Sequence, residues 1–235
     1  MKGGTVEDCR ITDNRLVDYA QNGGGVAFEQ GSKGVVRRTI IDGNNVNYGG
    51  DYGYGGGIYT PGGGVVENCL IVSNTATWGG GFYLDGSIWA TNCTIVGNSG
   101  SGAGIYGYNS GWKSSRFVNL ILRPRDGLAI SGSATTNGVD TMFSHCSIEA
   151  ISQTSKGVIC EFPEVNGNTH ALPEFVDAAA GDYRQTMHSP LRRAGLYAPW
   201  MHFAADLDGR KRASGGMVDI GCYQRPSGGL RLLVR

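Results

Sequence analysis

The feature that most constrains this sequence is an internal repeat, each copy of which ends in a glycine-rich run. The glycine-rich runs lie at residues 23–25, 55–57, 79–81 and 102–104. An asparagine precedes each run, at a distance that varies with the loop between them. These asparagines are Asn14, Asn44, Asn74 and Asn98, which stand 30, 30 and 24 residues apart. Periods of this length are typical of solenoids, in which each repeat forms one coil stacked on the next. The 40 glycines among 235 residues therefore serve the geometry of the coils.

The composition of each copy predicts short strands. Runs of β-branched residues, such as Ile40-Ile41 and Ile71-Val72, are broken by glycine and asparagine, and no stretch has the spacing of an amphipathic helix. One such coil cannot bury its own apolar side, but stacked coils can. The leucine-rich frame L-x-x-L-x-L and the calcium-binding run G-G-x-G-x-D are both missing. We therefore expect an all-β parallel β-helix of about five to seven coils.

Two ladders are expected to hold the coils in register. Asparagine tolerates left-handed backbone, and it can bond its counterpart one strand spacing, about 4.8 Å, away. The glycines supply positive φ and let one coil approach the next without a Cβ. We assign both ladders to the scaffold. Cys9, Cys69 and Cys93 share one position of the repeat, which predicts thiols stacked in a core and no disulfides between them.

The repeat resembles that of a known group of proteins. The stretch from Asn68-Cys69 to Tyr83 follows the pattern N-C-x-I-x-x-N-x-A-x-x-G-G-G-x-Y of right-handed parallel β-helix proteins, and the resemblance covers residues 1 to 125. The group includes polymorphic outer-membrane and autotransporter-like passengers and the pectate-lyase-like superfamily. The resemblance implies a right-handed helix.

A second series of motifs lies near the C-terminus: Leu172-Pro173-Glu174-Phe175-Val176-Asp177, Gly181-Asp182-Tyr183-Arg184, Ser189-Pro190, Ala194-Gly195, Asp206-Leu207-Asp208-Gly209-Arg210 and Val218-Asp219-Ile220-Gly221-Cys222-Tyr223. The series resembles the choice-of-anchor Q domain, which closes β-helices on bacterial secreted and surface proteins. This resemblance implies an extracellular or bacterial cell-surface location, and it implies no catalytic activity. Gln185 stands where the family usually has Leu, a departure that affects packing.

The motifs divide the chain into three parts. We expect β-helix coils over residues 1–169, a choice-of-anchor Q-like capping segment over 170–224, and a tail or last strand over 225–235. The repeat is degraded between residues 123 and 161, although Ser144-His145-Cys146 keeps the pattern of a coil strand. Because the chain begins within the repeat, we also expect the parent protein to have a further N-terminal region.

The loop between each asparagine and its glycine run varies most from coil to coil. Because the ladders fix the register, these loops should emerge along one edge, which would gather the following side chains: Tyr19, Tyr48, Tyr52, Tyr54, Trp78, Asp18 and Asp51. Aromatic faces beside carboxylates suit sugar rings and their hydroxyls, so these are our candidate ligand-binding residues. The alternative is that the rings pack over one another and cover glycine-rich backbone.

A column of charges of alternating sign precedes the cysteine position. Glu7, Arg37 and Glu67 should lie side by side on successive strands, with Arg38 beside Arg37. Such alternation stabilises a sheet surface by cross-strand pairing. If the protein is an enzyme, Arg37, Arg38, Glu7 and Glu67 are its candidate catalytic residues, on one face of successive coils.

Charge and spacing argue against several other classes of protein. Lys plus Arg equals Asp plus Glu, at 20 each, which leaves no basic footprint for nucleic acid. No apolar run is long enough for a transmembrane segment. The cysteines and histidines lack zinc spacing, so we expect no metal site and no cofactor, with calcium the one ion left open. We read Asp206-Leu207-Asp208 as a turn in which the carboxylates pair with Arg210, Arg212 or backbone N–H groups.

Two functions of different classes remain open at this point. The first is a secreted or cell-surface module that is not catalytic and binds carbohydrate or adheres to a glycan. The second is a polysaccharide lyase or glycoside hydrolase of the pectate-lyase-like superfamily. A third possibility is a spacer that holds another domain away from the cell.

Overall fold

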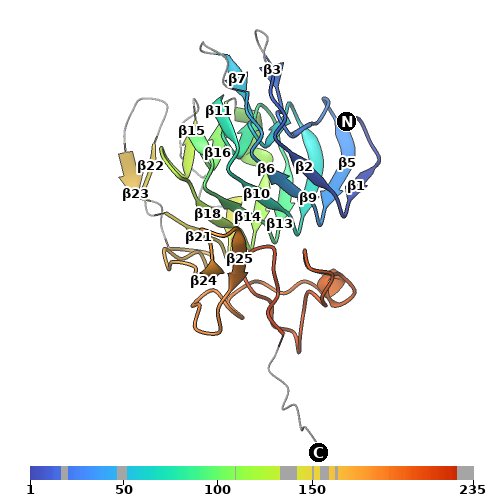
Figure 1. The fold of residues 1–235 in the computed structure, drawn as a ribbon, viewed down its shortest axis with the longest axis vertical. Helices are drawn as coiled ribbons and strands as arrows, with labels where there is room; N and C mark the ends of the chain where they lie inside the picture. Colours follow the sequence, from blue (N-terminus) through green and yellow to red (C-terminus); the bar gives the residue numbers. More distant parts are fainter. Residues whose placement is uncertain are drawn as a thin grey trace, which may run out of the picture.

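A computed structural model describes residues 1–16, 21–46, 52–108, 110–132, 142–149, 151–153, 159–161 and 164–226. Over these residues the chain winds into a right-handed parallel β-helix of about five turns, which confirms the predicted fold. A C-terminal segment with little regular structure follows the helix and lies beside it (Figure 1). None of the helices in the described part of the chain is long and apolar enough to cross a membrane.

Each turn of the helix contributes strands to parallel sheets, which we name A to D in chain order. Sheet A holds β1 (Thr5–Glu7), β5 (Ser32–Arg37), β9 (Gly63–Glu67), β13 (Trp89–Thr91), β17 (Arg116–Val118) and β20 (Phe143–Ser144). Sheet B holds β2 (Arg10–Thr12), β6 (Ile40–Asp42), β10 (Leu70–Val72), β14 (Thr94–Val96), β18 (Ile121–Arg123) and β21 (Ser147–Ile148).

The other two sheets complete each turn. Sheet C holds β3 (Gln21–Asn22), β7 (Gly53–Tyr54), β11 (Thr75–Trp78) and β15 (Ser99–Ser101). Sheet D holds β4 (Val26–Ala27), β8 (Ile58–Thr60), β12 (Phe82–Leu84), β16 (Ile105–Gly107) and β19 (Ile130–Gly132). Two antiparallel pairs lie outside the turns, and they are β22 (Ile151–Gln153) with β23 (Ile159–Glu161), and β24 (Phe175–Asp177) with β25 (Asp182–Gln185).

The corner between sheets A and B is made by one residue with left-handed backbone in every coil. The φ angles lie between 44° and 57° at Asp8, Arg38, Asn68, Asn92, Asn119 and His145. In the coil of Asn68, the next residue, Cys69, donates its thiol to the carbonyl oxygen of Glu67, at 3.2 Å. The same bond recurs from Cys9, Thr39, Cys93 and Cys146, at 2.9 to 3.3 Å. A side-chain donor that closes this turn explains why cysteine and threonine occupy the position.

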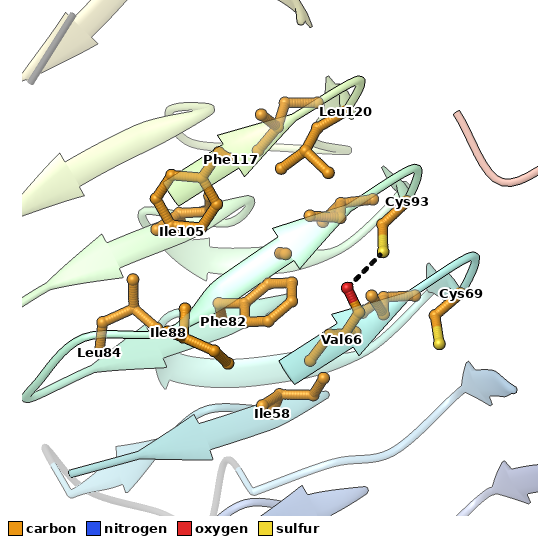
Figure 2. Packing of buried hydrophobic residues seen from close by; sticks show 14 of the residues in the cluster. Ile58, Val66, Cys69, Phe82, Leu84, Ile88, Cys93, Ile105, Phe117 and Leu120 are labelled. Carbon is orange, nitrogen blue, oxygen red and sulfur yellow. Dashed lines mark hydrogen bonds between the residues drawn. The ribbon is translucent and has the colours of Figure 1, made fainter. Parts of the chain in front are cut away.

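The predicted stack of buried thiols without disulfides is confirmed in most coils. Cys69, Cys93 and Cys146 are buried free thiols, and Figure 2 shows Cys69 and Cys93 above one another beside the apolar core. Cys9 is also free, but it is exposed, so the prediction that its thiol is stacked in the core is wrong. The side chain of Cys160 lies outside the described residues.

The asparagine ladder lies at the corner between sheets B and C. Asn74 donates its amide N–H groups to Asn98 Oδ1 at 3.0 Å and to Ile41 O at 2.9 Å. Its own Oδ1 accepts from the backbone and the side chain of Asn44, at 3.0 and 2.9 Å. Asn74 is fully buried, so the ladder satisfies polar groups that water cannot reach. The structural role predicted for this ladder is confirmed. The left-handed backbone expected at these asparagines is instead found at the residue before each of them, which is Asp13, Gly43, Ser73 or Gly97.

The glycine runs allow neighbouring coils to touch through their backbones. A Cβ at Gly56 would lie 2.7 Å from the carbonyl oxygen of Gly80, and one at Gly57 would lie 2.8 Å from that of Gly81. Directly after these runs, Ile58 and Phe82 point inward into the core (Figure 2). The glycines therefore belong to the scaffold, as the repeat predicted.

The C-terminal segment packs against the outer face of sheet B. Leu191 and Ile220 of the segment form one apolar cluster with Leu70, Val96 and Ile121 of the sheet. Gly221 makes this approach possible, because its φ is +100° and a Cβ there would lie 2.7 Å from Ile121 Cδ1. The last parallel pairing in the described part of the chain joins Ser147 to Thr169.

The buried asparagine ladder predicts that two substitutions differ strongly in their effect on the free energy of unfolding. Asn74→Ala should lower the free energy of unfolding by about 3 kcal/mol, because it removes four hydrogen bonds and leaves their buried partners unpaired. Asn14→Ala, at the exposed end of the ladder, should cost about 1 kcal/mol or less. Urea unfolding of both variants measures the difference, and equal losses would contradict the structural role of the ladder.

Candidate functional site

A groove between the A/B corner and the C-terminal segment combines charged and aromatic side chains. Its volume is about 600 Å³, within the range of small-ligand sites. The β-helix wall consists of Asp8, Arg37, Arg38, Glu67 and Asn68. The opposite wall consists of Trp200, Phe203, Ala204, Ala205 and Gly209. We call this site the corner groove.

The register of sheet A assembles the charged wall. Glu7 pairs with Arg37, and Arg37 with Glu67, on three successive strands, as the sequence predicted. Arg37 Nε and Nη2 both bond Glu7 Oε2, at 2.9 and 2.6 Å. The guanidinium of Arg37 therefore keeps the pKa of the Glu7 carboxyl below its usual value.

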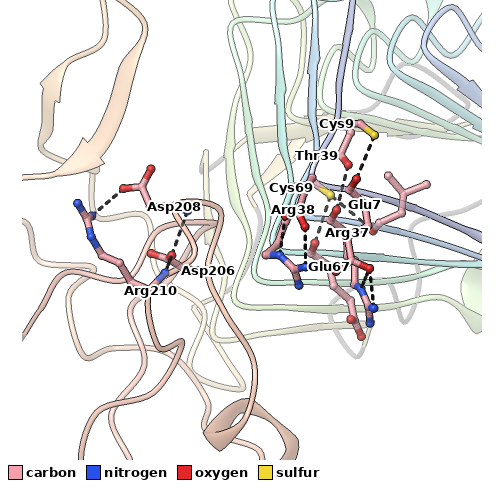
Figure 3. A network of polar contacts seen from close by, with 12 residues as sticks. Glu7, Cys9, Arg37, Arg38, Thr39, Glu67, Cys69, Asp206, Asp208 and Arg210 are labelled. Atoms are coloured by element: carbon pink, nitrogen blue, oxygen red, sulfur yellow. Dashed lines mark hydrogen bonds and ion pairs between the residues drawn. The ribbon is translucent and has the colours of Figure 1, made fainter.

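Arg38 connects the charged column to the corner. Its guanidinium bonds both carboxylate oxygens of Asp8, at 2.8 and 3.0 Å. It also bonds Glu7 (Figure 3). The hydrogen bonds from Arg38 lower the pKa of Asp8. Arg38 holds a φ of 44°, where the other coils mostly place asparagine or aspartate. A long side chain in left-handed backbone is unusual and costs free energy, which points to a role outside the scaffold.

Glu67 and Asn68 differ from the paired charges beside them. Burial raises the pKa of the Glu67 carboxyl, and the charge of Arg37 offsets this only in part. Asn68 is 3% exposed, and its buried Oδ1 has no hydrogen-bond partner in the described part of the chain. The groove is thus lined by a carboxyl group that holds its proton more firmly than usual and by an asparagine whose amide oxygen is buried and unsatisfied.

The opposite wall is built by a short 3-10 helix, η3 (Pro199–His202). Met201 is buried in a small cluster with Ala213 and Val218, and this anchor holds η3 in place. Trp200 and Phe203 consequently point outward, with exposed fractions of 40% and 90%. An almost fully exposed phenylalanine at the rim of a groove is a typical mark of a binding surface.

The corner groove therefore combines four kinds of group. Ion pairs hold Arg37 and Arg38 in place, Glu67 can donate a proton, Asn68 can accept a hydrogen bond, and two rings offer apolar faces. Sequence reasoning singled out Arg37, Arg38 and Glu67 but missed Asp8, Asn68, Trp200 and Phe203. The one sequence feature that could have indicated the second wall is the pair of aromatic residues in the run Pro199-Trp200-Met201-His202-Phe203.

The predicted aromatic edge is described only in part. Asp18, Tyr19, Tyr48 and Asp51 lie outside the described residues. Tyr54 packs on Tyr83, with ring centroids 4.8 Å apart, and Trp78 packs on Tyr106, at 5.0 Å. Tyr83 and Tyr106 are buried members of a ladder on sheet D, so these contacts follow the alternative in which rings cover one another. Tyr52 remains exposed, and its role as a ligand-binding residue stays a prediction.

The acidic turn of the C-terminal segment has the predicted form. Asp206 Oδ1 accepts the backbone N–H groups of Asp208 and Arg210, at 3.0 and 2.7 Å. Asp208 pairs with Arg210 at 2.7 Å (Figure 3). Within the described ranges, no three His, Cys, Asp or Glu side chains are grouped as a metal site would require.

Comparison with known proteins agrees with this architecture. Residues 2–121 match the family model described as right handed beta helix region, which covers half of the chain. The chain belongs to this right-handed β-helix family. No curated protein and no solved structure matches the chain.

Two carboxyl groups of the charged column on sheet A, Glu67 and Glu7, should respond to pH in opposite ways. Because the pKa of Glu67 is raised by folding, the ionised carboxylate destabilises the β-helix once the pH rises through that value. Glu67→Gln should therefore raise the melting temperature at pH 7, and the gain should vanish below the ordinary glutamate pKa of 4.5.

Glu7→Gln is the matched control for this prediction. The pKa of Glu7 is lowered by folding, so its contribution to stability is present at neutral pH and is lost as the pH falls through the lowered value. Glu7→Gln should lower the melting temperature at pH 7 and have a smaller effect in acid. If both variants shift the melting temperature in the same direction at pH 7, the assignment of the two environments is wrong.

Proposed function

We propose that this protein is a secreted or cell-surface β-helix module that binds carbohydrate in the corner groove. The observation that carries the proposal is the placement of two exposed rings, Trp200 and Phe203, opposite the charged and amide groups of the A/B corner. Sugar rings present apolar faces to aromatic side chains, and their hydroxyls bond carboxyl, guanidinium and amide groups. The groove offers both kinds of contact within one site.

The strained backbone at Arg38 supports this assignment. Asparagine stands at this corner in the coils of Asn68, Asn92 and Asn119, and Asn119 there donates its side-chain amide to Asn92 Oδ1 at 2.9 Å. An asparagine at position 38 would suit the backbone better than arginine does. Retaining an arginine there is reasonable if its guanidinium, together with that of Arg37, contacts a ligand.

The proposed location rests on the C-terminal segment. The motifs between Leu172 and Tyr223 resemble the choice-of-anchor Q domain, and we propose that the segment is such a domain in an extracellular or bacterial surface protein. The segment supplies Trp200 and Phe203, so in this proposal it also completes the binding site.

The rings provide the direct test. Trp200→Ala and Phe203→Ala should each weaken retention on immobilised polysaccharide by about tenfold, because each removes one stacking face. Both rings are exposed, so the melting temperature should stay close to that of the wild type. Affinity electrophoresis over a panel that includes pectin and alginate measures retention and identifies the polymer.

Three further variants locate the site. Leu172→Ala, which removes another exposed apolar side chain, should not change retention. Arg38→Asn should keep the stability while it weakens retention, because it relieves the backbone and removes the guanidinium. Tyr52→Ala tests the aromatic edge instead. If the wild type binds no glycan in the panel, or if only Tyr52→Ala abolishes binding, the corner groove is not the site.

A second candidate function is glycoside hydrolysis in the same groove. The observation that favours it is the presence of two carboxyl groups whose pKa values are shifted in opposite directions, raised at Glu67 and lowered at Asp8. Such a pair divides the roles of acid and base. Glu67 would give its proton to the leaving oxygen, and Asp8 would take a proton from the attacking water.

A reducing-end assay separates this function from binding alone. A hydrolase should release reducing ends from the polymer that it retains, and Glu67→Gln should reduce that rate at least about a hundredfold. Glu174→Gln, at an exposed position outside the groove, should keep the full rate. A wild type that retains a polymer without cleaving it is a binding module.

A further inference from the structure

A separate cavity in the C-terminal segment is lined by four arginines and no acidic residue. Its volume is about 380 Å³, and it shares no lining residue with the corner groove. The arginines are Arg184, Arg192, Arg210 and Arg225. They come from β25, from the loop after it, from the acidic turn and from the last described residues, so the fold brings them together from four places in the sequence.

Only two of these four arginines form an ion pair with a carboxylate of the described chain. Arg184 and Arg210 share the carboxylate of Asp208, at 2.7 Å from each. Arg184 also reaches Asp182, at 3.1 Å. In contrast, Arg192 and Arg225 donate to main-chain oxygens, at 2.7 and 3.0 Å, and neither pairs with a carboxylate of the described chain.

The guanidinium of Arg192 also has a donor without a hydrogen-bond acceptor. Arg192 Nε is buried and has no acceptor among the described residues. A buried donor on a charged group costs free energy when it is left unpaired. The cavity therefore holds two guanidinium groups that lack a carboxylate partner in the described chain, and an anion would supply the missing negative charge.

Besides the arginines and two glutamines, Gln185 and Gln224, the lining consists of apolar and aromatic side chains. Tyr223 forms the aromatic side, and the guanidinium of Arg184 lies over its ring at 5.3 Å. Val176 and Met187 stand at the cavity with exposed fractions of 53% and 60%. A hydrated inorganic ion makes no use of such a surface, whereas an organic anion with an apolar body does.

We propose that this arginine cavity binds a small organic oxyanion, a carboxylate or a phosphate carried on an apolar body. The planar fork of arginine matches both groups, because each presents two oxygens at the spacing of the guanidinium N–H donors. Arg192 and Arg225 would hold the oxyanion, while Met187 and Tyr223 would cover the apolar body. The proposal is independent of glycan binding in the corner groove.

Calorimetric titration with phenyl phosphate, benzoate and inorganic phosphate tests the proposal. Phenyl phosphate or benzoate should bind at one site per chain, and about tenfold or more tightly than inorganic phosphate. Arg192→Gln and Arg225→Gln should each weaken that binding about tenfold, because each removes a charge-assisted hydrogen bond. Arg116→Gln, at an exposed position on sheet A, should have no effect.

One more variant separates loss of binding from loss of fold. Val176→Asp changes an exposed side chain and places a carboxylate beside the arginines, so it should compete with the ligand without unfolding the segment. Three results would overturn the proposal: no binding of either organic anion, equal binding of all three anions, or binding that Val176→Asp and both arginine variants leave unchanged.

Discussion

The structure depends on hydrogen bonds between side chains at the same position of successive coils. Asn44, Asn74 and Asn98 form one continuous buried chain of such bonds, and a shift of one residue in any coil would break it. The register that these bonds fix determines which side chains face the core and which face outward. It also determines which outward residues become neighbours, although they lie 30 positions apart in the sequence.

The corner between sheets A and B shows how scaffold and site share one element. The other coils have asparagine, aspartate or histidine at this corner in left-handed backbone, and in most coils a cysteine or threonine closes the turn. One coil places Arg38 there, against local preference, and ties it to Asp8. Because the neighbouring coils show which residues this corner usually holds, the arginine at position 38 stands out, and it lies within the corner groove.

Much of the fold could be predicted from the sequence, because the repeat reports its own register. Spacing alone aligned Glu7, Arg37 and Glu67 and assigned the glycines to the scaffold. The corner groove could be predicted only in part. Its second wall comes from a segment without periodicity, and no local pattern indicates that Trp200 and Phe203 lie opposite a corner more than 130 positions earlier in the chain. Likewise, burial that raises the pKa of Glu67 arises from packing, which composition does not report.

A crystal structure of the protein with a retained oligosaccharide would test the central claim most directly. We expect a sugar ring stacked on Trp200 or Phe203, with hydroxyls within hydrogen-bond distance of Glu67, Asn68 or the arginines of the corner. An oligosaccharide bound at the loops that carry Tyr52, with the corner groove free of sugar, would contradict the account.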